Sequence, residues 1–207
     1  MTVDAGADRF EVLVVCTGNV CRSPVAEQVL RARFGERFAR FSSAGTFALV
    51  GAQMPEQAQQ LARTLGAEPG PVHAPRMLDA DLIDRADLVL ALTREHRAEI
   101  VRLLPRANRR TVTLREAARL LESLAAAPGI ETDLARLRAQ PVPDALRALV
   151  PMMLAERGLA TPPADPADDD VVDPYRQQQE VYDRSGAQIA DAIERSEAAL
   201  RAIAARA

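Results

Sequence analysis

The sequence predicts an α/β fold in which helices cover both faces of a four-stranded parallel sheet, in a doubly wound, flavodoxin-like arrangement. Three observations support this fold class. Short runs rich in Val and Leu alternate with segments of helical periodicity, the connections between them are short, and the first apolar run leads directly into a Gly-containing loop and a helix start. Alternating β and α units of this kind form parallel sheets. Ligands bind such sheets at the carboxyl ends of the strands.

The first half of the chain supplies two of these β and α units. Residues 10–15 read as a buried strand, and apolar residues at helical spacing predict a helix from residue 24 to about residue 38. A short strand is expected near residues 40–43. A second helix is expected over residues 55–65, with Gly66 as its end.

The second half continues the alternation. A buried strand is expected over residues 87–92, and Thr93 is placed to cap the helix that follows. Residues 111–114 and 115–124 predict a fourth strand and a fourth helix. The apolar positions in residues 178–205 lie along one face, which predicts a closing packing helix.

Residues 123–169 interrupt this rhythm with a proline-rich segment that we interpret as a helical insertion within a single domain of residues 1–207. Helical fragments are expected around residues 134–137 and 145–154, followed by a mobile stretch over residues 161–170. The insertion has three alternative roles: a cover for the functional site, a surface for a partner, or a surface elaboration without a catalytic role.

Composition restricts the class of protein. The 207 residues are 48% hydrophobic and 27% charged, enough for one sizeable core, and the net charge of −3 offers no basic face for nucleic acid. The longest apolar runs are too short to cross a membrane, and the first eight residues lack the regions of a signal peptide. We therefore expect a cytoplasmic protein. The sequence does not indicate its oligomeric state.

The most informative segment runs from Cys16 to Ser23, where a cysteine is followed after five residues by Arg22. The loop lies between a strand end and a helix start, where free backbone N–H groups and the helix dipole favour an anion. The same field favours thiolate over thiol, and a guanidinium can hold two phosphate oxygens. We expect Cys16 to be a nucleophile and Arg22 to bind phosphate, together with the remaining loop residues Thr17, Gly18, Asn19, Val20, Cys21 and Ser23.

The loop has other interpretations. A nucleotide P-loop requires a lysine, and this chain contains none. Cys16 as a small buried hydrophobe and Arg22 as a solvated charge form the plainest alternative. The two cysteines lie five residues apart, and this spacing in one loop predicts a catalytic or redox role rather than a disulfide framework.

Four segments together resemble the low-molecular-weight protein tyrosine phosphatases: residues 16–27, 43–46, 86–93 with His96, and Asp173-Pro174-Tyr175. The resemblance covers about residues 10–122 and 170–205. It implies a phosphotyrosine phosphatase I-like fold and metal-independent hydrolysis of protein phosphotyrosine through a cysteinyl-phosphate intermediate. Neither a cofactor nor a metal is implied, and the expected partner is a phosphotyrosine-containing protein substrate.

The resemblance also implies roles for individual residues. It assigns the general acid to Asp173, although Asp165-Pro166 is a second Asp-Pro pair in the chain. Asn19, Ser43 and His73 resemble a hydrogen-bonded network that holds the loop. Ser23 resembles a hydroxyl that bonds the nucleophile sulfur, although an N-cap serine would look the same. Tyr175 resembles an aromatic wall of the cleft, and Arg176 stands where the family often has a second aromatic.

Other functions share parts of this pattern. A thioredoxin-coupled arsenate reductase of this fold needs resolving cysteines downstream, and none follows Cys21. A non-catalytic phosphate-binding module would have lost the nucleophile or the acid. A protein-arginine phosphatase of the same fold resembles this chain but carries a threonine where Val20 stands, so Val20, expected to face the cleft, favours phosphotyrosine. The acidic run of residues 168–170 is interpreted as a solvated hinge rather than a divalent-cation site.

Overall fold

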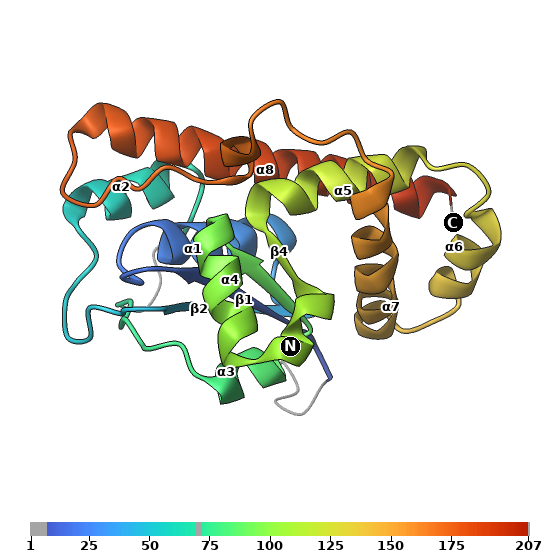
Figure 1. Ribbon diagram of the computed structural model, residues 1–207, viewed down its shortest axis with the longest axis horizontal. Coiled ribbons are helices and arrows are strands. Elements are labelled where there is room, and N and C mark those ends of the chain that lie inside the picture. Colours follow the sequence, from blue (N-terminus) through green and yellow to red (C-terminus); the bar gives the residue numbers. More distant parts are fainter. Residues whose placement is uncertain (1–7, 69–71, 207) are drawn as a thin grey trace.

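The protein is described by a computed structural model that covers residues 8–68 and 72–206. Its centre is a parallel sheet in the order β2-β1-β3-β4 (Figure 1). The strands are β1 (Phe10–Cys16), β2 (Ala39–Gly45), β3 (Leu88–Ala91) and β4 (Thr111–Thr113). The predicted four-stranded parallel fold is confirmed. Because the chain places β2 on one side of β1 and β3 on the other, the loop after β1 lies at the switch point where such sheets bind ligands.

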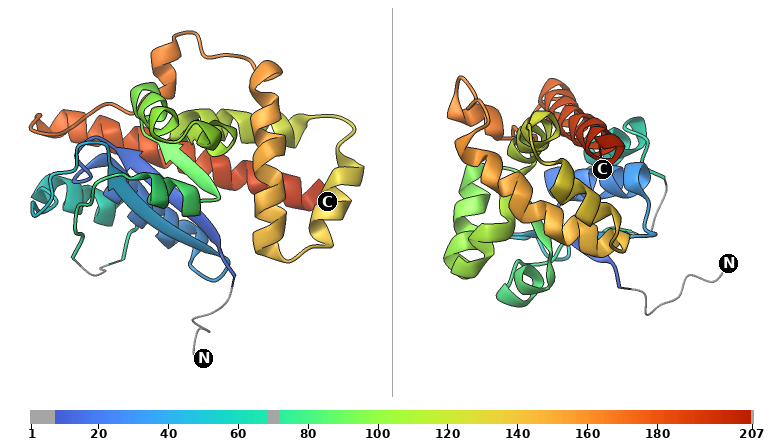
Figure 2. Two further views of the ribbon diagram at one scale, coloured as in Figure 1. Left: turned by 60° about the horizontal axis from the view of Figure 1, so that its bottom comes forward. Right: turned by 90° about the vertical axis from the view of Figure 1, so that its right-hand side faces the viewer.

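Helices cover both faces of this sheet (Figure 2). One core is formed with α1 (Arg22–Phe34), α2 (Glu56–Thr64), α5 (Leu114–Ala126) and α8 (Gln179–Arg206). The other core is formed with α3 (Ala80–Arg85), α4 (Arg94–Leu103) and the 3-10 turn Pro105–Arg110. Along β1, Val12 and Val14 belong to the first core and Leu13 and Val15 to the second. This alternation is the two-residue period of a strand buried on both faces.

The insertion folds into α6 (Glu131–Arg138) and α7 (Val142–Ala155), followed by the 3-10 turns Glu156–Gly158 and Pro166–Asp169. Figure 1 shows α6 and α7 beside the C-terminal half of α8, away from the centre of the sheet. Leu134 and Met153 are buried in the core that α5 and α8 share. Arg147 of α7 bonds Asp87, just before β3, at 3.1 Å and the carbonyl oxygen of Arg9 at 2.8 Å. The insertion is therefore packed against the sheet domain through apolar and ionic contacts.

The structure differs from the expected elements in four places. The first helix begins at Arg22 and ends at Phe34, because Gly35 follows with φ of 66°. The short helix α3 and the turn Pro105–Arg110 were not predicted, since each has only six residues and too little periodicity to detect. The expected mobile stretch contains the turn Pro166–Asp169 and is held by ion pairs from Asp169 and Asp170.

Within residues 8–68 and 72–206, no helix combines the length and the apolar character needed to cross a membrane. The expectation about a signal peptide concerns positions that, apart from Asp8, lie outside the described residues.

Candidate active site

The loop between β1 and α1 places the Cys16 sulfur in contact with two polar groups, the Ser23 hydroxyl and the Asn19 N–H. Its Sγ lies 3.0 Å from Ser23 Oγ and accepts a hydrogen bond from the Asn19 N–H at 3.3 Å. Ser23 does not cap the helix as the sequence suggested, because α1 already begins at Arg22 and the N-cap residue is Cys21, without a side-chain cap. The Ser23 hydroxyl is therefore available to stabilise negative charge on sulfur.

The backbone of this loop faces its amides inward. The carbonyl oxygens of Cys16, Thr17 and Gly18 accept hydrogen bonds of 2.9–3.0 Å from the segment that follows β2. In a trans peptide the N–H points opposite to the C=O of the same plane. Because the carbonyls are bonded outward, the N–H groups of the following residues point into the loop, as the Asn19 bond to sulfur shows. These amides form a cradle for a tetrahedral anion.

Asn19 holds the loop in a left-handed backbone conformation, with φ of 53°. Its side-chain Nδ2 donates to Ser23 Oγ at 2.9 Å and to Ser43 Oγ at 2.8 Å, and a ring nitrogen of His73 lies 2.7 Å from its backbone oxygen. The structure thus brings together the three residues expected to support the loop. Of the residues from Cys16 to Ser23, Asn19 alone has a positive φ.

Gly45 at the end of β2 explains the motif of residues 43–46. A Cβ at this position would collide with the backbone oxygen of Thr17 and lie 3.0 Å from Asn19 Cβ. Only glycine lets the end of β2 approach the loop this closely.

Arg22 and Asp173 meet at the mouth of the loop. Arg22 is 5% exposed, and one of its guanidinium nitrogens donates to Asp173 Oδ2 at 2.7 Å, while the other donates to the Val171 carbonyl at 3.2 Å. The second carboxylate oxygen of Asp173 accepts from the Tyr175 N–H at 3.1 Å. Asp165 instead accepts from Ala167 within the turn Pro166–Asp169. Of the two Asp-Pro pairs, the structure brings Asp173 to Arg22.

His96 is a site residue to which sequence reasoning gave no role. Its ring nitrogens lie 2.8 Å from Thr17 Oγ1 and 2.9 Å from Thr93 Oγ1, and the residue is 5% exposed. Burial, together with the positive charge of Arg22, lowers the pKa of His96 to about 4. The ring is therefore neutral near pH 7 and orients Thr17. Its place just after the carboxyl end of β3 is the signal that could have revealed it.

Glu27 is a second residue that was missed. One of its oxygens accepts from Ser43 Oγ at 2.6 Å, and the other pairs with Arg31 at 2.6 Å. Glu27 thus extends the network of Asn19 and Ser43 from the loop to the surface of α1. The signal was its spacing of four residues from Ser23, which places both on one side of the helix.

The side chains expected to face the substrate lie only partly as predicted. Tyr175 is half-buried, and the guanidinium of Arg176, whose φ is 60°, stacks 5.1 Å from the centre of its ring. Phe47 is 72% exposed and donates its backbone N–H to Thr17. Val20 is 2% exposed and belongs to the core, so the expectation that its methyl groups face the cleft was wrong for most of the side chain.

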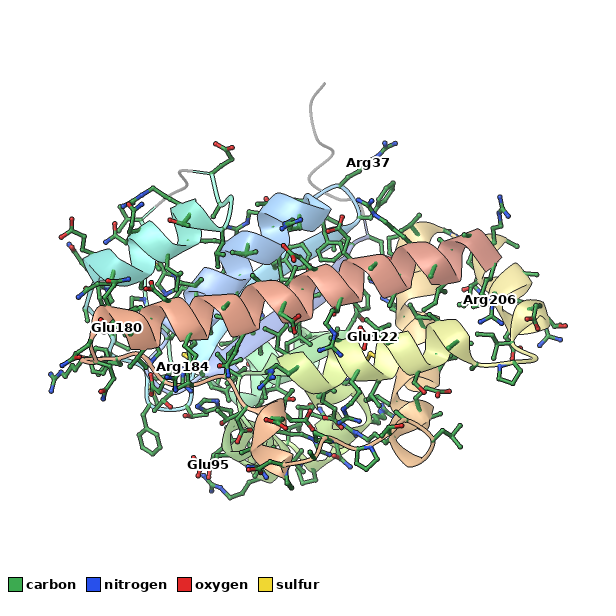
Figure 3. All side chains as sticks on the ribbon, turned by 90° about the horizontal axis from the view of Figure 1, so that it is seen from above. Arg37, Glu95, Glu122, Glu180, Arg184 and Arg206 are labelled. Carbon is green, nitrogen blue, oxygen red and sulfur yellow. The ribbon has the colours of Figure 1, made fainter. Side chains whose placement is uncertain are left out.

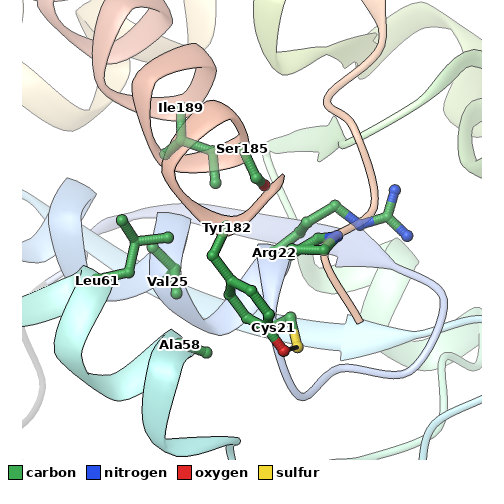
Figure 4. A pocket seen from close by; sticks show the side chains of 9 residues that line it. Cys21, Arg22, Val25, Ala58, Leu61, Tyr182, Ser185 and Ile189 are labelled. Atoms are coloured by element: carbon green, nitrogen blue, oxygen red, sulfur yellow. Dashed lines mark hydrogen bonds between the residues drawn. The ribbon is translucent and has the colours of Figure 1, made fainter. Parts of the chain in front are cut away.

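Cys21 lies beneath the loop, facing Tyr182 of α8 (Figure 4). Its sulfur is 3.9 Å from the Tyr182 hydroxyl, and burial raises the pKa of this thiol to about 12. Cys21 is therefore a protonated thiol near pH 7. Only its backbone can face a bound phosphate, and its thiol is poorly suited to rapid attack on an oxidised Cys16.

The acidic run of residues 168–170 is engaged by arginines. Asp169 pairs with Arg119 at 2.9 Å, and Asp170 pairs with Arg94 at 3.0 Å. In the part of the chain that the structure describes, no three acidic, histidine or cysteine side chains are grouped as metal ligands.

Known proteins resemble this chain in the part that contains the Cys16–Ser23 loop. Residues 11–123 match the family model described as low molecular weight phosphotyrosine protein phosphatase. The chain is 34% identical over 103 residues to the low molecular weight protein-tyrosine-phosphatase Ptp of Acinetobacter johnsonii, covering 50% of this chain and 70% of the relative. It is 36% identical over 107 residues to a protein-arginine-phosphatase of Geobacillus stearothermophilus, covering 52% and 70%.

Solved structures show the same fold. The YwlE arginine phosphatase of Geobacillus stearothermophilus aligns with a TM-score of 0.62 and 25% identity, covering 93% of each chain. The tyrosine phosphatase amsI of Erwinia amylovora aligns with a TM-score of 0.62 and 22% identity, covering 95% of this chain and 96% of its own. The family model matches more than half of the chain, including the whole loop from Cys16 to Ser23, and the chain belongs to the low molecular weight phosphotyrosine protein phosphatase family.

Proposed function

We propose that this protein hydrolyses phosphotyrosine in protein substrates, with Cys16 as nucleophile, Arg22 as phosphate ligand and Asp173 as general acid. The observation that carries the proposal is the convergence of the Cys16 sulfur, inward loop amides and the buried Arg22 on one point, with Asp173 at 2.7 Å from Arg22. This arrangement supplies a nucleophile, charge stabilisation and a proton donor without a metal ion.

The reaction has two steps, phosphoryl transfer to Cys16 and hydrolysis of the cysteinyl-phosphate. In the first, the Cys16 thiolate attacks phosphorus, an S–P bond forms, and the P–O bond to the tyrosine breaks while Asp173 gives its proton to the leaving oxygen. In the second, Asp173 takes a proton from water, the water oxygen attacks phosphorus, and the S–P bond breaks to release inorganic phosphate. Ser23, 3.0 Å from the sulfur, stabilises the thiolate as it leaves.

Arg22 and the loop amides hold the three equatorial oxygens during both steps. The charge on these oxygens is the largest electrostatic demand of the reaction, and preorganised donors meet it best. Asn19, Ser43, His73 and Glu27 keep the loop amides fixed through their hydrogen bonds.

Dephosphorylation of phosphoarginine is the second candidate, favoured by the similarity to protein-arginine phosphatases. We place it second because the buried Val20 side chain, which lies beside Gly18, brings no hydroxyl to the loop, and a phosphoarginine guanidinium there would lack a hydrogen-bond partner at a cost of about 1–3 kcal/mol. Phe47 is 72% exposed and its backbone N–H bonds the Thr17 carbonyl, so it offers an apolar surface beside the loop that suits a flat aromatic ring.

A direct comparison tests this choice. Matched peptides carrying phosphotyrosine or phosphoarginine are given to the protein in the presence of a chelator, and kcat/KM is measured for each. We expect phosphotyrosine to be preferred by about 10- to 100-fold, the factor that this energy implies. Faster hydrolysis of the phosphoarginine peptide would establish the second candidate instead.

We further propose that the protein works in the bacterial cytoplasm. The relatives named above come from bacteria. A nucleophilic thiol also has to stay reduced, as the cytosol keeps it, and both Cys16 and Cys21 are free thiols.

A further inference from the structure

The segment that carries Asp173 is fixed to the rest of the molecule at several points. We call residues 165–173 the strap, because they run from the insertion to the loop that precedes α8. The Val171 N–H donates to the Leu92 carbonyl at 2.8 Å, and the Val172 N–H donates to Gln188 Oε1 at 2.9 Å. Asp169, Asp170 and Asp173 add side-chain contacts to arginines.

One of these contacts is lost during catalysis. Phosphate oxygens bind the same guanidinium of Arg22 that Asp173 occupies here at 2.7 Å. When phosphate takes this place, Asp173 has to give up Arg22 and turn its oxygen towards the leaving group. From that moment the position of Asp173 depends on the other contacts of the strap.

Two arginines of neighbouring helices form ion pairs with the strap. Arg119 of α5 donates to Asp169 Oδ2 at 2.9 Å, and both side chains are largely buried, with 21% and 15% exposed. Arg94 of α4 contacts both oxygens of Asp170 through its side chain, and its backbone N–H donates to Oδ1 at 2.7 Å. Arg115 adds a bond of 3.2 Å to the Asp170 carbonyl.

We propose that Arg119 and Arg94 are positioning residues for Asp173, which hold the strap so that the general acid reaches the leaving oxygen once phosphate has displaced it from Arg22. The inference rests on the proposed function. It also assigns Asp169 and Asp170 of the acidic run a role as the anchor of the segment that connects the insertion to the active site.

The test uses leaving groups of different basicity. Phenyl phosphate needs a proton on its leaving oxygen, whereas 2,4-dinitrophenyl phosphate needs little, so the ratio of their kcat/KM values reports the general acid. We measure this ratio for the wild type, Arg119→Gln, and the double variant Arg119→Gln/Arg94→Gln. Loss of general stability does not change the ratio, because both substrates use the same phosphate loop.

Misplacement of a catalytic group by about 1 Å can cost about 100-fold, so we expect a fall of about 10-fold in kcat/KM for phenyl phosphate in the double variant. For 2,4-dinitrophenyl phosphate the fall should stay below about twofold. Arg119→Lys should restore part of the ratio, because Arg119 contacts Asp169 through a single nitrogen. Asp169→Asn should reproduce the effect of Arg119→Gln from the strap side and serves as the second variant if Arg119→Gln does not fold.

Arg195→Gln is the matched control. Arg195 of α8 makes a two-point ion pair with Glu122 of α5, at 2.6 and 2.7 Å, and has no bond to the strap. Figure 3 labels Glu122 between these two helices. The ratio should be that of the wild type in this variant.

The positioning role would be overturned if the ratio of the two kcat/KM values stayed unchanged in the Arg119 and Asp169 variants, or if both kcat/KM values fell equally. The proposed function would still stand in that case, because the wild type would hydrolyse both substrates. Absence of wild-type turnover of both aryl phosphates with a chelator present would overturn the proposed function, and this inference with it.

Discussion

Replacing Asp173 with alanine should have two separate effects, because Asp173 is the proposed proton donor and also binds the guanidinium of Arg22. The Arg22–Asp173 bond is charge-assisted, and such bonds contribute about 1.5–3 kcal/mol. Because half of the Asp173 side chain is exposed, solvent screening reduces this to about 1 kcal/mol. Phosphate no longer has to displace a carboxylate in the variant, so Asp173→Ala should bind inorganic phosphate about fivefold more tightly.

The same substitution should lower kcat for phosphotyrosine peptides by about 10²–10⁴-fold, and much less for aryl phosphates whose leaving group needs little protonation. Calorimetric titration with phosphate and steady-state kinetics measure the two effects on one preparation. Asp165→Ala is the comparison variant, since its carboxylate caps the turn Pro166–Asp169 and has no bond to Arg22, and it should change both values little. Weaker phosphate binding in Asp173→Ala would refute the idea that phosphate and Asp173 compete for Arg22. A larger loss of kcat in Asp165→Ala than in Asp173→Ala would indicate that Asp165, in the insertion, is the general acid.

Three further predictions concern the loop and its supports. Val20→Thr changes shape little but adds a hydroxyl to a buried side chain that lies beside Gly18 of the loop, and should narrow the preference for phosphotyrosine over phosphoarginine peptides; an unchanged ratio of kcat/KM would show that this side chain does not set the preference. Gly45→Ala should destabilise the fold by about 1–3 kcal/mol in urea unfolding, because its Cβ meets the loop backbone; wild-type stability would show that the strand end moves freely. The pKa of His96 is about 4 when folded and near 6.5 when unfolded, so the unfolded chain takes up this proton first as pH falls. The contribution of the neutral His96 ring to the free energy of unfolding is complete above pH 6.5 and is lost towards pH 4. The difference in this free energy between wild type and His96→Gln, measured by urea unfolding, should therefore shrink by about 2 kcal/mol from pH 7.5 to pH 4.5. A constant difference would contradict a buried neutral ring.

The sheet and its main helices could be predicted from the sequence because their signals are local. Val12, Leu13, Val14 and Val15 form an uninterrupted apolar run, as expected for a strand buried on both faces. The helix α3 escaped prediction because its six residues bury only Ile83 and are placed by the strand that follows.

The site residues that could be predicted are likewise those that lie close together in the sequence. Cys16 and Arg22 share one loop, so sequence spacing alone brings them together. The links from His96 to Thr17 and from Arg119 to Asp169 join residues 79 and 50 positions apart, and only the folded sheet and helices make them neighbours. The direction of Val20 was misjudged because spacing in a loop does not fix which way a side chain turns.

The central claim is that phosphate passes through the sulfur of Cys16. The most direct measurement mixes the protein with a phosphotyrosine peptide in the presence of a chelator, quenches the reaction within its first turnovers, and locates the phosphate by peptide mass spectrometry. We predict phosphate on Cys16, none in Cys16→Ser, and loss of turnover in that variant while inorganic phosphate still binds. Undiminished turnover in Cys16→Ser, or phosphate carried on a different residue of the wild type, would contradict the account.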